Sequence, residues 1–224
     1  MPTPNFRLSD SQVADLAVAC EIGGSRLEEI AVNIARQKPT IRRSKIEAIL
    51  QENLGPEKGV TMARLLFGIA GTFRRASLSA KEVLDAITPA VKAREHQDER
   101  LRAWGGCRAG LERLLITQSI SLAAKAIDIS YDFERVYITG RLLTSVRPVF
   151  DEPREEIVGS TIVQTLRLEF VSSDGDQSSI SIALDADDIR QLRKECERAI
   201  NKAEKARDEM EAKFRFEAII TGEE

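Results

Sequence analysis

The stretch TIVQTLRLEFVSSDGDQSSISIAL, residues 161–184, decides the fold of the C-terminal half of the chain. In its first segment apolar residues alternate with polar ones. The apolar residues are Ile162, Leu166, Leu168 and Phe170. Such alternation predicts a β-strand with one buried face. Asp174-Gly175 is a hairpin turn signal, and the return segment repeats the alternation with Ile180 and Ile182. The stretch therefore predicts an antiparallel β-hairpin.

The segment before the hairpin also favours β-structure. From near Ser119 the helical period gives way to a run rich in Ile, Val, Tyr and Phe, which predicts one or two strands. The pair Arg147-Pro148 interrupts the end of this run, and residues 151–160 are typical of a loop. Because proline cannot donate to a β-ladder, we interpret the pair as the place where the strand leaves the sheet. Two alternatives stay open: a subunit or partner interface, and a site for an anion or a substrate.

A long helix is predicted after the hairpin. Asp185 fits its N-cap, and Asp187 and Asp188 place negative charge in its first turn, where the helix dipole favours it. Apolar residues then recur at spacings of three and four; they are Ile189, Leu192, Cys196, Ala199, Ala203, Ala206 and Met210. Because most members of this seam are small, it is too weak to hold an isolated coiled coil. We expect the first half of the helix, around Ile189, Leu192 and Ile200, to pack on the sheet.

Residues 1–118 have the pattern of a helical bundle. Short apolar faces of helical period are separated by glycine and proline, and Ser79 with Glu82 has the form of a capping box. Gly105, Gly106 and Gly110 predict either a helix break or a close approach between helices. The sequence thus predicts an α+β protein: an N-terminal α-helical bundle, residues 1–118, followed by a small antiparallel β-sheet with a long C-terminal helix, residues 119–224.

The amino-acid composition limits the class of protein to which the chain can belong. The 224 residues are 42% hydrophobic and 31% charged, which favours globular domains over disorder. The net charge of −3 is divided between a mildly basic first half and an acidic second half. The sequence shows neither a membrane-spanning run nor a secretory signal, so we expect a cytoplasmic protein. Three widely spaced cysteines suggest reduced, mostly buried thiols and no zinc site.

Catalytic motifs are not evident, and we expect no enzyme, no cofactor and no metal site. His96 is the single histidine and lies among charged residues typical of a solvated helix. The aspartates at 185, 187 and 188 lack the glycine and terminal glutamate of a calcium loop, so capping explains them better. The segment GIAGTF, residues 68–73, lacks the Lys-Ser/Thr ending of a phosphate-binding loop.

The order of a strand with a polar break, the hairpin, and the continuation DADDIRQLRKECERAI resembles the COMM-domain family. That resemblance covers about residues 120–215 and implies a module that associates through its sheet and helix, without catalysis. It implies a homodimer, or a hetero-oligomer with a related protein, and a scaffolding or regulatory role in larger assemblies. The candidate interface residues are Arg147, Pro148, Leu166, Leu168, Ile180, Ile182, Ile189 and Leu192.

Nucleic-acid binding is the alternative from another class. Basic residues cluster at two predicted helix ends in the first half; they are Arg42, Arg43, Lys45, Arg74 and Arg75. They would contact phosphates, and such binding weakens with added salt. Arginine at a helix C-terminus also complements the helix dipole without any ligand, so we favour the association protein.

Overall fold

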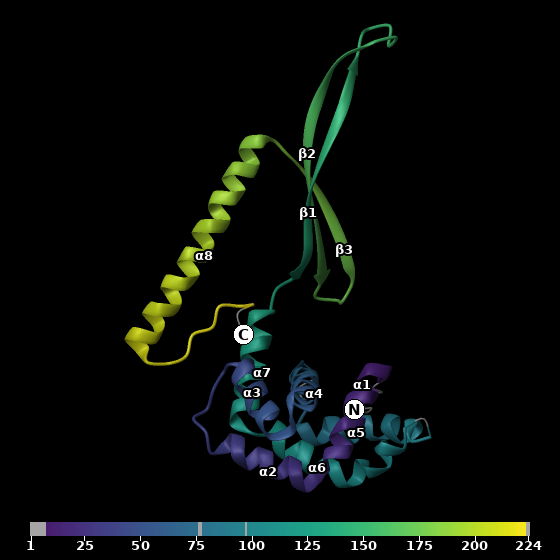
Figure 1. Ribbon diagram of the computed structural model, residues 1–224, viewed down its shortest axis with the longest axis vertical. Helices are drawn as coiled ribbons and strands as arrows, with labels where there is room; N and C mark the ends of the chain where they lie inside the picture. Colours follow the sequence, from purple (N-terminus) through teal and green to yellow (C-terminus); the bar gives the residue numbers. More distant parts are fainter. Residues whose placement is uncertain (1–7, 76–77, 97, 223–224) are drawn as a thin grey trace. The chain divides into compact units, whose positions relative to one another are not determined.

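A computed structural model describes residues 8–75, 78–96 and 98–222, apart from the side chains of Phe73 and Arg75 (Figure 1). The chain divides into two compact units. The first contains the helices up to Ser130, and the second is Tyr131–Ile220. This arrangement confirms the α+β class, with helices first, then an antiparallel sheet, then a long helix. In the described ranges, none of the helices has the length and apolar character needed to cross a membrane.

The first unit is a bundle of α-helices with one short 3-10 helix. The elements are α1 (Asp10–Ile22), α2 (Gly24–Ala35), α3 (Arg43–Leu54), α4 (Pro56–Arg75), α5 (Ala80–Arg94), η1 (Glu99–Ala103), α6 (Trp104–Leu115) and α7 (Gln118–Ser130). Capping boxes begin two of them: Ser9 with Gln12 before α1, and Ser79 with Glu82 before α5. The capping box predicted at Ser79 is therefore confirmed. Pro89 lies inside α5 without dividing it.

Aliphatic side chains from all these helices form one core. The largest fully buried ones are Leu16, Leu27, Ile30, Ile34, Ile46, Leu50, Met62, Leu66, Leu84, Leu101, Leu111 and Leu114. The indole N–H of the buried Trp104 donates to the Thr88 hydroxyl at 3.0 Å, so the ring is buried with its polar atom satisfied. This unit has the interior that a stable domain of its size requires.

Glycines bring α2 and α6 unusually close together. A Cβ added at Gly110 would lie 2.5 Å from the Gly24 carbonyl oxygen and 2.7 Å from the Leu27 Cβ. A Cβ at Gly24 would lie 2.1 Å from the Gly106 carbonyl oxygen. The sequence left open a helix break or a close approach at these glycines. The structure shows a close approach, and α6 runs unbroken through Gly105, Gly106 and Gly110.

The change from helix to strand lies later than the sequence indicated. Residues 118–130 form α7, whereas we expected the helical period to end near Ser119. Ile120, Ala123 and Ala124 are buried, and Ile127 packs against the same core. Their spacing of three and four residues is that of a helix face. The many isoleucines suggested strand, but packing of this face on the bundle outweighs their propensity.

The second unit contains a three-stranded antiparallel sheet in the order β1-β2-β3. The strands are β1 (Arg135–Phe150), β2 (Ile157–Ser172) and β3 (Gln177–Leu184). The predicted hairpin is confirmed: Gly175 has φ 86°, and its N–H donates to the Ser172 carbonyl at 2.9 Å. Since β3 pairs only with β2 residues 164–171, β1 and β2 continue beyond it as a two-stranded ribbon. We call this ribbon, residues 145–163, the arm (Figure 1).

Two sequence interpretations of the arm are wrong. β1 passes through Arg147-Pro148 to Phe150, so the pair does not mark the place where the strand leaves the sheet. Proline is tolerated there because β1 is an edge strand. The loop predicted at 151–160 is shorter, since β2 begins at Ile157. Its turn is held by the Asp151 carboxylate, which accepts from the backbone N–H groups of Glu155 and Glu156 at 2.8 and 3.2 Å.

Helix α8 (Ala186–Phe214) follows the sheet and begins as predicted. The Asp185 carboxylate accepts from the N–H groups of Asp187 and Asp188, both at 2.8 Å. In return, the Asp185 N–H donates to the Asp188 carboxylate at 3.0 Å. This reciprocal pair is a capping box, which fixes the first turn of the helix.

We expect Asp185→Ala to reduce the helicity of α8. Loss of an N-cap acceptor costs about 1 kcal/mol, and α8 has no buried residue that would compensate. Far-UV circular dichroism during thermal unfolding measures the loss. Asp208→Ala is the matched control because it removes the same charge from the same helix, far from the cap. Equal loss in both variants would contradict the capping role.

Candidate association surface

The second unit has no interior of its own. From Tyr131 to Ile220, a range that the structure describes completely, no residue is buried. Large apolar side chains lie exposed on the strands and on α8. Burial of apolar surface is the main force that stabilises a folded chain, and this unit gains little of it alone. A unit of this kind needs a further surface to cover its apolar residues.

The sheet has one strongly apolar face, which strand pairing defines. Leu166 lies opposite Leu142 of β1 and Ile182 of β3, and residues directly opposite one another share a face. We define the apolar face by Leu142, Val146, Ile162, Leu166, Leu168, Phe170, Ile180, Ile182 and Leu184. Leu142, Ile180 and Ile182 remain 50%, 45% and 40% exposed. The apolar face thus extends over all three strands without a cover.

Four of the candidate interface residues lie together at the centre of this face. Leu166 pairs with Ile182, and Leu168 pairs with Ile180, so the four form one block across β2 and β3. The β1 part of the face, Leu142 and Val146, was not among the candidates predicted from the sequence. Their even spacing was a usable signal, since residues two or four apart on a strand share a face.

Close packing at one end of the apolar face orders its side chains. A Cβ added at Gly140 would lie 3.0 Å from Leu168 Cδ2 and 3.1 Å from the Tyr137 hydroxyl oxygen. The Tyr137 ring therefore lies over the glycine. Nearby, the Arg135 guanidinium lies 5.2 Å from the centre of the Phe170 ring, a cation–π contact. These contacts give this end of the face a defined shape.

The opposite face of the sheet is much more polar. Its central positions are Arg141, Leu143, Thr165, Arg167, Glu169, Ser179, Ser181 and Ala183. Arg167 and Glu169 form an ion pair at 3.8 Å on this face. Charged and hydroxyl groups of this kind are well solvated, so this face has little need of a cover.

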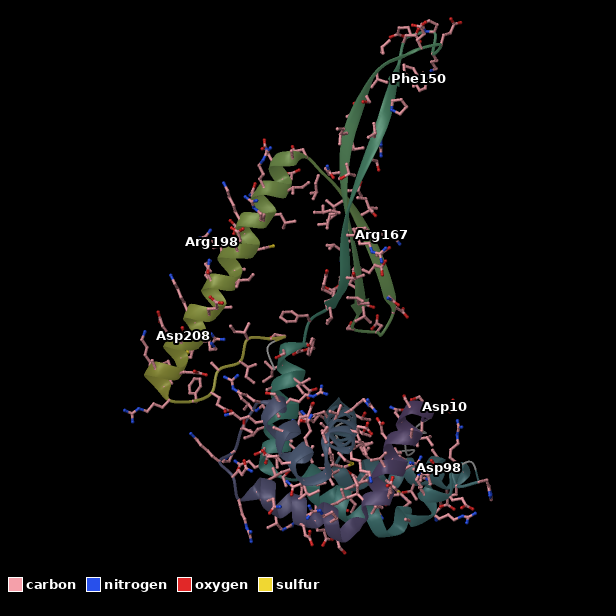
Figure 2. All side chains as sticks on the ribbon, in the orientation of Figure 1. Asp10, Asp98, Phe150, Arg167, Arg198 and Asp208 are labelled. Atoms are coloured by element: carbon pink, nitrogen blue, oxygen red, sulfur yellow. The ribbon has the colours of Figure 1, made fainter. Side chains whose placement is uncertain are left out.

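The arm carries exposed apolar residues far beyond β3. Val146 and Ile162 lie opposite each other and are 64% and 65% exposed. Figure 2 shows Phe150 near the tip of the arm, where it is also exposed. A two-stranded ribbon is marginally stable in water, so the arm also favours a partner.

The remaining candidates on the strands, Arg147 and Pro148, lie in the arm. They pair with Thr161 and Ser160, away from the central block of leucines and isoleucines. Arg147 shares the more polar face, whereas Pro148 continues the apolar one. The structure therefore separates the two residues that the sequence treated as one feature.

Helix α8 does not pack on the sheet as expected. Ile189 is half-buried at its start, whereas Leu192 is 42% exposed and Ile200 is 61% exposed. Figure 2 shows the charged side chains of Arg198 and Asp208 projecting from the same helix. The seam is too poor in large side chains to bury the helix on its own sheet. It remains open along its length.

Two of the basic residues of the nucleic-acid alternative, Arg43 and Arg74, form side-chain contacts within the first unit. Arg74 forms an ion pair with Asp128 of α7. Arg43 lies 5.4 Å from the centre of the Phe67 ring and 3.9 Å from the Glu47 carboxylate. The backbone N–H of Arg42 donates to the Thr40 hydroxyl, and Lys45 lies in the first turn of α3. The side chain of Arg75 lies outside the described residues. Nucleic-acid binding stays a prediction, and a salt titration with duplex DNA tests it.

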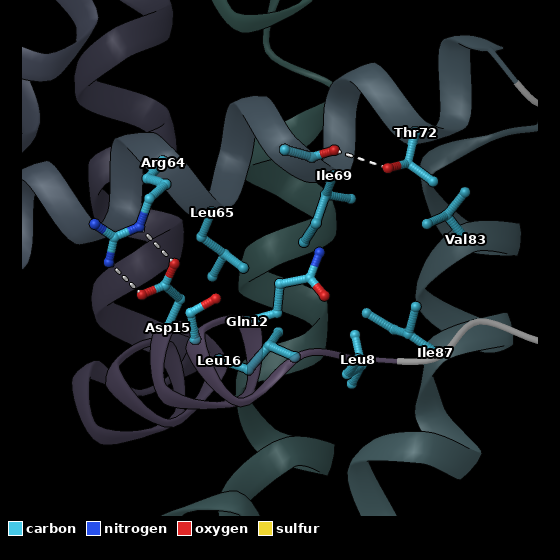
Figure 3. Close-up of a pocket in the computed structure, with 12 residues that line it drawn as sticks. Leu8, Gln12, Asp15, Leu16, Arg64, Leu65, Ile69, Thr72, Val83 and Ile87 are labelled. Atoms are coloured by element: carbon cyan, nitrogen blue, oxygen red, sulfur yellow. Dashed lines mark hydrogen bonds and ion pairs between the residues drawn. The ribbon is translucent and has the colours of Figure 1, made fainter. Parts of the chain in front are cut away.

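A cavity of about 430 Å³ opens in the first unit between α1, α4 and α5. Figure 3 shows Leu8, Ile69 and Ile87 pointing toward one another around it. At one end, the Arg64 Nε donates to the buried Asp15 carboxylate at 2.8 Å, and a second guanidinium nitrogen contacts the other oxygen. This pairing raises the pKa of Arg64. The cavity lining is mainly apolar and also includes the polar side chains of Ser11, Gln12 and Thr72, which suits a largely apolar ligand with a few polar groups.

Groups for catalysis do not converge at the surfaces described above. His96 is exposed, and the described residues contain no cluster of three or more His, Cys, Asp or Glu side chains that would hold a metal ion. The chain matches no family model, and no curated protein matches its sequence significantly.

Proposed function

We propose that the protein is a non-catalytic association protein, a scaffold or regulator that joins a second copy of itself through its C-terminal unit. The observation that carries the proposal is the absence of any buried residue from Tyr131 to Ile220, all of which the structure describes. A partner that binds to the second unit would bury both the exposed apolar face and the arm. The COMM-like order of elements supports the same proposal.

A second copy is the partner that best fits these surfaces. Each chain carries an uncovered apolar sheet face and a helix with an uncovered apolar seam. In a two-fold dimer the same patches of both subunits meet, so each contact occurs twice. A two-fold dimer therefore buries the apolar face and the helix seam of both subunits. A related chain with the same sheet face and helix seam would cover these surfaces as well.

The helical unit would then be the part that recognises other proteins. It has its own core, so association of the C-terminal unit leaves its surface available. We place the protein in the cytoplasm, where unpaired thiols such as that of Cys196 persist.

The solution mass of the full chain tests the proposal. We expect sedimentation equilibrium to give twice the 24.9 kDa of one chain across the micromolar range. The mass should fall to that of one chain only on strong dilution. A monomer at every concentration, with the β-sheet signal intact, would contradict the proposal.

A further inference from the structure

Two cysteines that are far apart in the sequence meet in the core of the helical unit. Cys20 lies in α1 and Cys107 in α6, and their Sγ atoms are 3.1 Å apart. Both are unpaired thiols, and their residues are 4% and 1% exposed. The third cysteine, Cys196, lies exposed on α8. A sulfur–sulfur bond is about 2.05 Å long, so the two sulfur atoms need to approach by only about 1 Å to be joined.

We propose that Cys20 and Cys107 form a reversible modification site: a hydroperoxide oxidises them to a disulfide that links α1 to α6. This inference is independent of the proposed association, because both residues belong to the helical unit. Disulfides in a reducing compartment are typically transient and respond to oxidants.

The surroundings assign different roles to the two sulfur atoms. The two sulfur atoms share a hydrogen bond, and this contact lowers the pKa of Cys20. The Arg100 guanidinium lowers the pKa of Cys20 further, although burial and the Asp98 carboxylate raise it. The pKa of Cys107 is raised by the same hydrogen bond and by burial. Because the thiolate is the nucleophile, we assign the attack on the oxidant to Cys20, whose pKa is the lower of the two.

The chemistry balances with hydrogen peroxide as the oxidant. The Cys20 thiolate attacks one peroxide oxygen, the O–O bond breaks, and the departing hydroxide takes a proton to leave as water. The product is a sulfenic acid on Cys20. The Cys107 sulfur then attacks the Cys20 sulfur, forming the S–S bond and expelling the hydroxyl group as a second water with the Cys107 proton. A dithiol reductant reverses the reaction by exchange.

The bond would restrain the helix that forms one wall of the cavity. α1 contributes Gln12, Asp15 and Leu16 to the cavity lining, and Cys20 follows Leu16 by one helical turn. A covalent link at Cys20 holds this end of α1 to α6. Oxidation therefore opposes any opening of the helical unit that separates α1 from α6.

The test uses the full chain with Cys196→Ser, which leaves Cys20 and Cys107 as its thiols. After treatment with hydrogen peroxide, the protein is denatured and alkylated with iodoacetamide. We expect the untreated protein to take up the label on both cysteines and the treated protein on neither. Peptide mapping should show the two cysteine peptides joined, with a mass about 2 Da lower for the two lost hydrogens. The unfolding temperature should rise by several degrees and return after dithiothreitol.

The matched control is Cys107→Ser in the same background. It keeps Cys20 in place but removes the second sulfur, so peroxide should produce neither the cross-link nor the thermal shift. If that variant fails to fold, Cys107→Ala serves instead. The proposal is overturned if both thiols stay alkylatable in the C196S protein at a peroxide dose that fully oxidises Cys196 in the unaltered chain. A cross-link between two chains through Cys20 would overturn it as well.

Discussion

Replacing Leu166 and Ile182 together with aspartate is expected to convert the proposed dimer to a monomer. The two residues lie opposite each other on β2 and β3, at the centre of the apolar face. Each substitution removes about 1.5–3 kcal/mol of apolar burial from the interface. Placing a carboxylate there adds a desolvation penalty of several kcal/mol. We therefore expect the dissociation constant to rise at least about 1000-fold, which corresponds to about 4 kcal/mol.

The neighbouring pair on the same two strands supplies the control. Thr165 and Ala183 also lie opposite each other, but they occupy the more polar face. Thr165→Asp with Ala183→Asp adds the same charge one residue away and should leave the mass of the complex unchanged. Sedimentation equilibrium of both variants measures the difference. Circular dichroism shows whether each variant keeps its helices.

The outcomes separate two modes of association. Loss of the dimer in the Leu166/Ile182 variant alone supports contact through the apolar face. Equal loss in both variants would indicate pairing through the edge of β3, which carries positions 182 and 183, since unpaired strand edges can also join chains. A dimer that survives in both variants would contradict our assignment of the apolar face.

Short-range patterns predicted the elements that depend on neighbouring residues. The alternation around Leu166 and Leu168, the turn at Gly175 and the cap at Asp185 each involve residues a few positions apart. Such features fix local geometry wherever they occur. The block of four interface candidates followed directly, because the turn sets the register of β2 against β3.

Short-range sequence patterns did not predict the features that depend on tertiary packing. Residues 118–130 are rich in isoleucine yet form a helix, because the bundle offers a surface for one helical face. Packing of α8 on the sheet was predicted from its apolar seam, but small alanines give that contact too little burial. The meeting of Cys20 with Cys107 follows from the packing of α1 on α6, which no sequence spacing encodes. The length of the arm depended on how far β1 pairs with β2.

Gly110→Ala is expected to destabilise the helical unit by about 3 kcal/mol, although alanine is the better helix former. The added Cβ would lie 2.5 Å from the Gly24 carbonyl oxygen, a backbone atom that cannot turn aside. Relief of this contact requires α2 and α6 to move apart, which opens the core around Leu27 and Leu111. The unfolding temperature should fall by about 10 °C.

Gly105→Ala on the same helix distinguishes a steric effect from a helix-propensity effect. A Cβ at Gly105 meets nothing within 4 Å among the described atoms, so this variant should be as stable as the parent or gain up to about 1 kcal/mol. Chemical denaturation monitored by the fluorescence of Trp104 measures both variants, because this residue is buried in the same helix. If Gly110→Ala proves neutral, α2 and α6 are farther apart in solution than the structure places them. In that case the distance between the Cys20 and Cys107 thiols, which depends on the position of α6, would need to be measured directly.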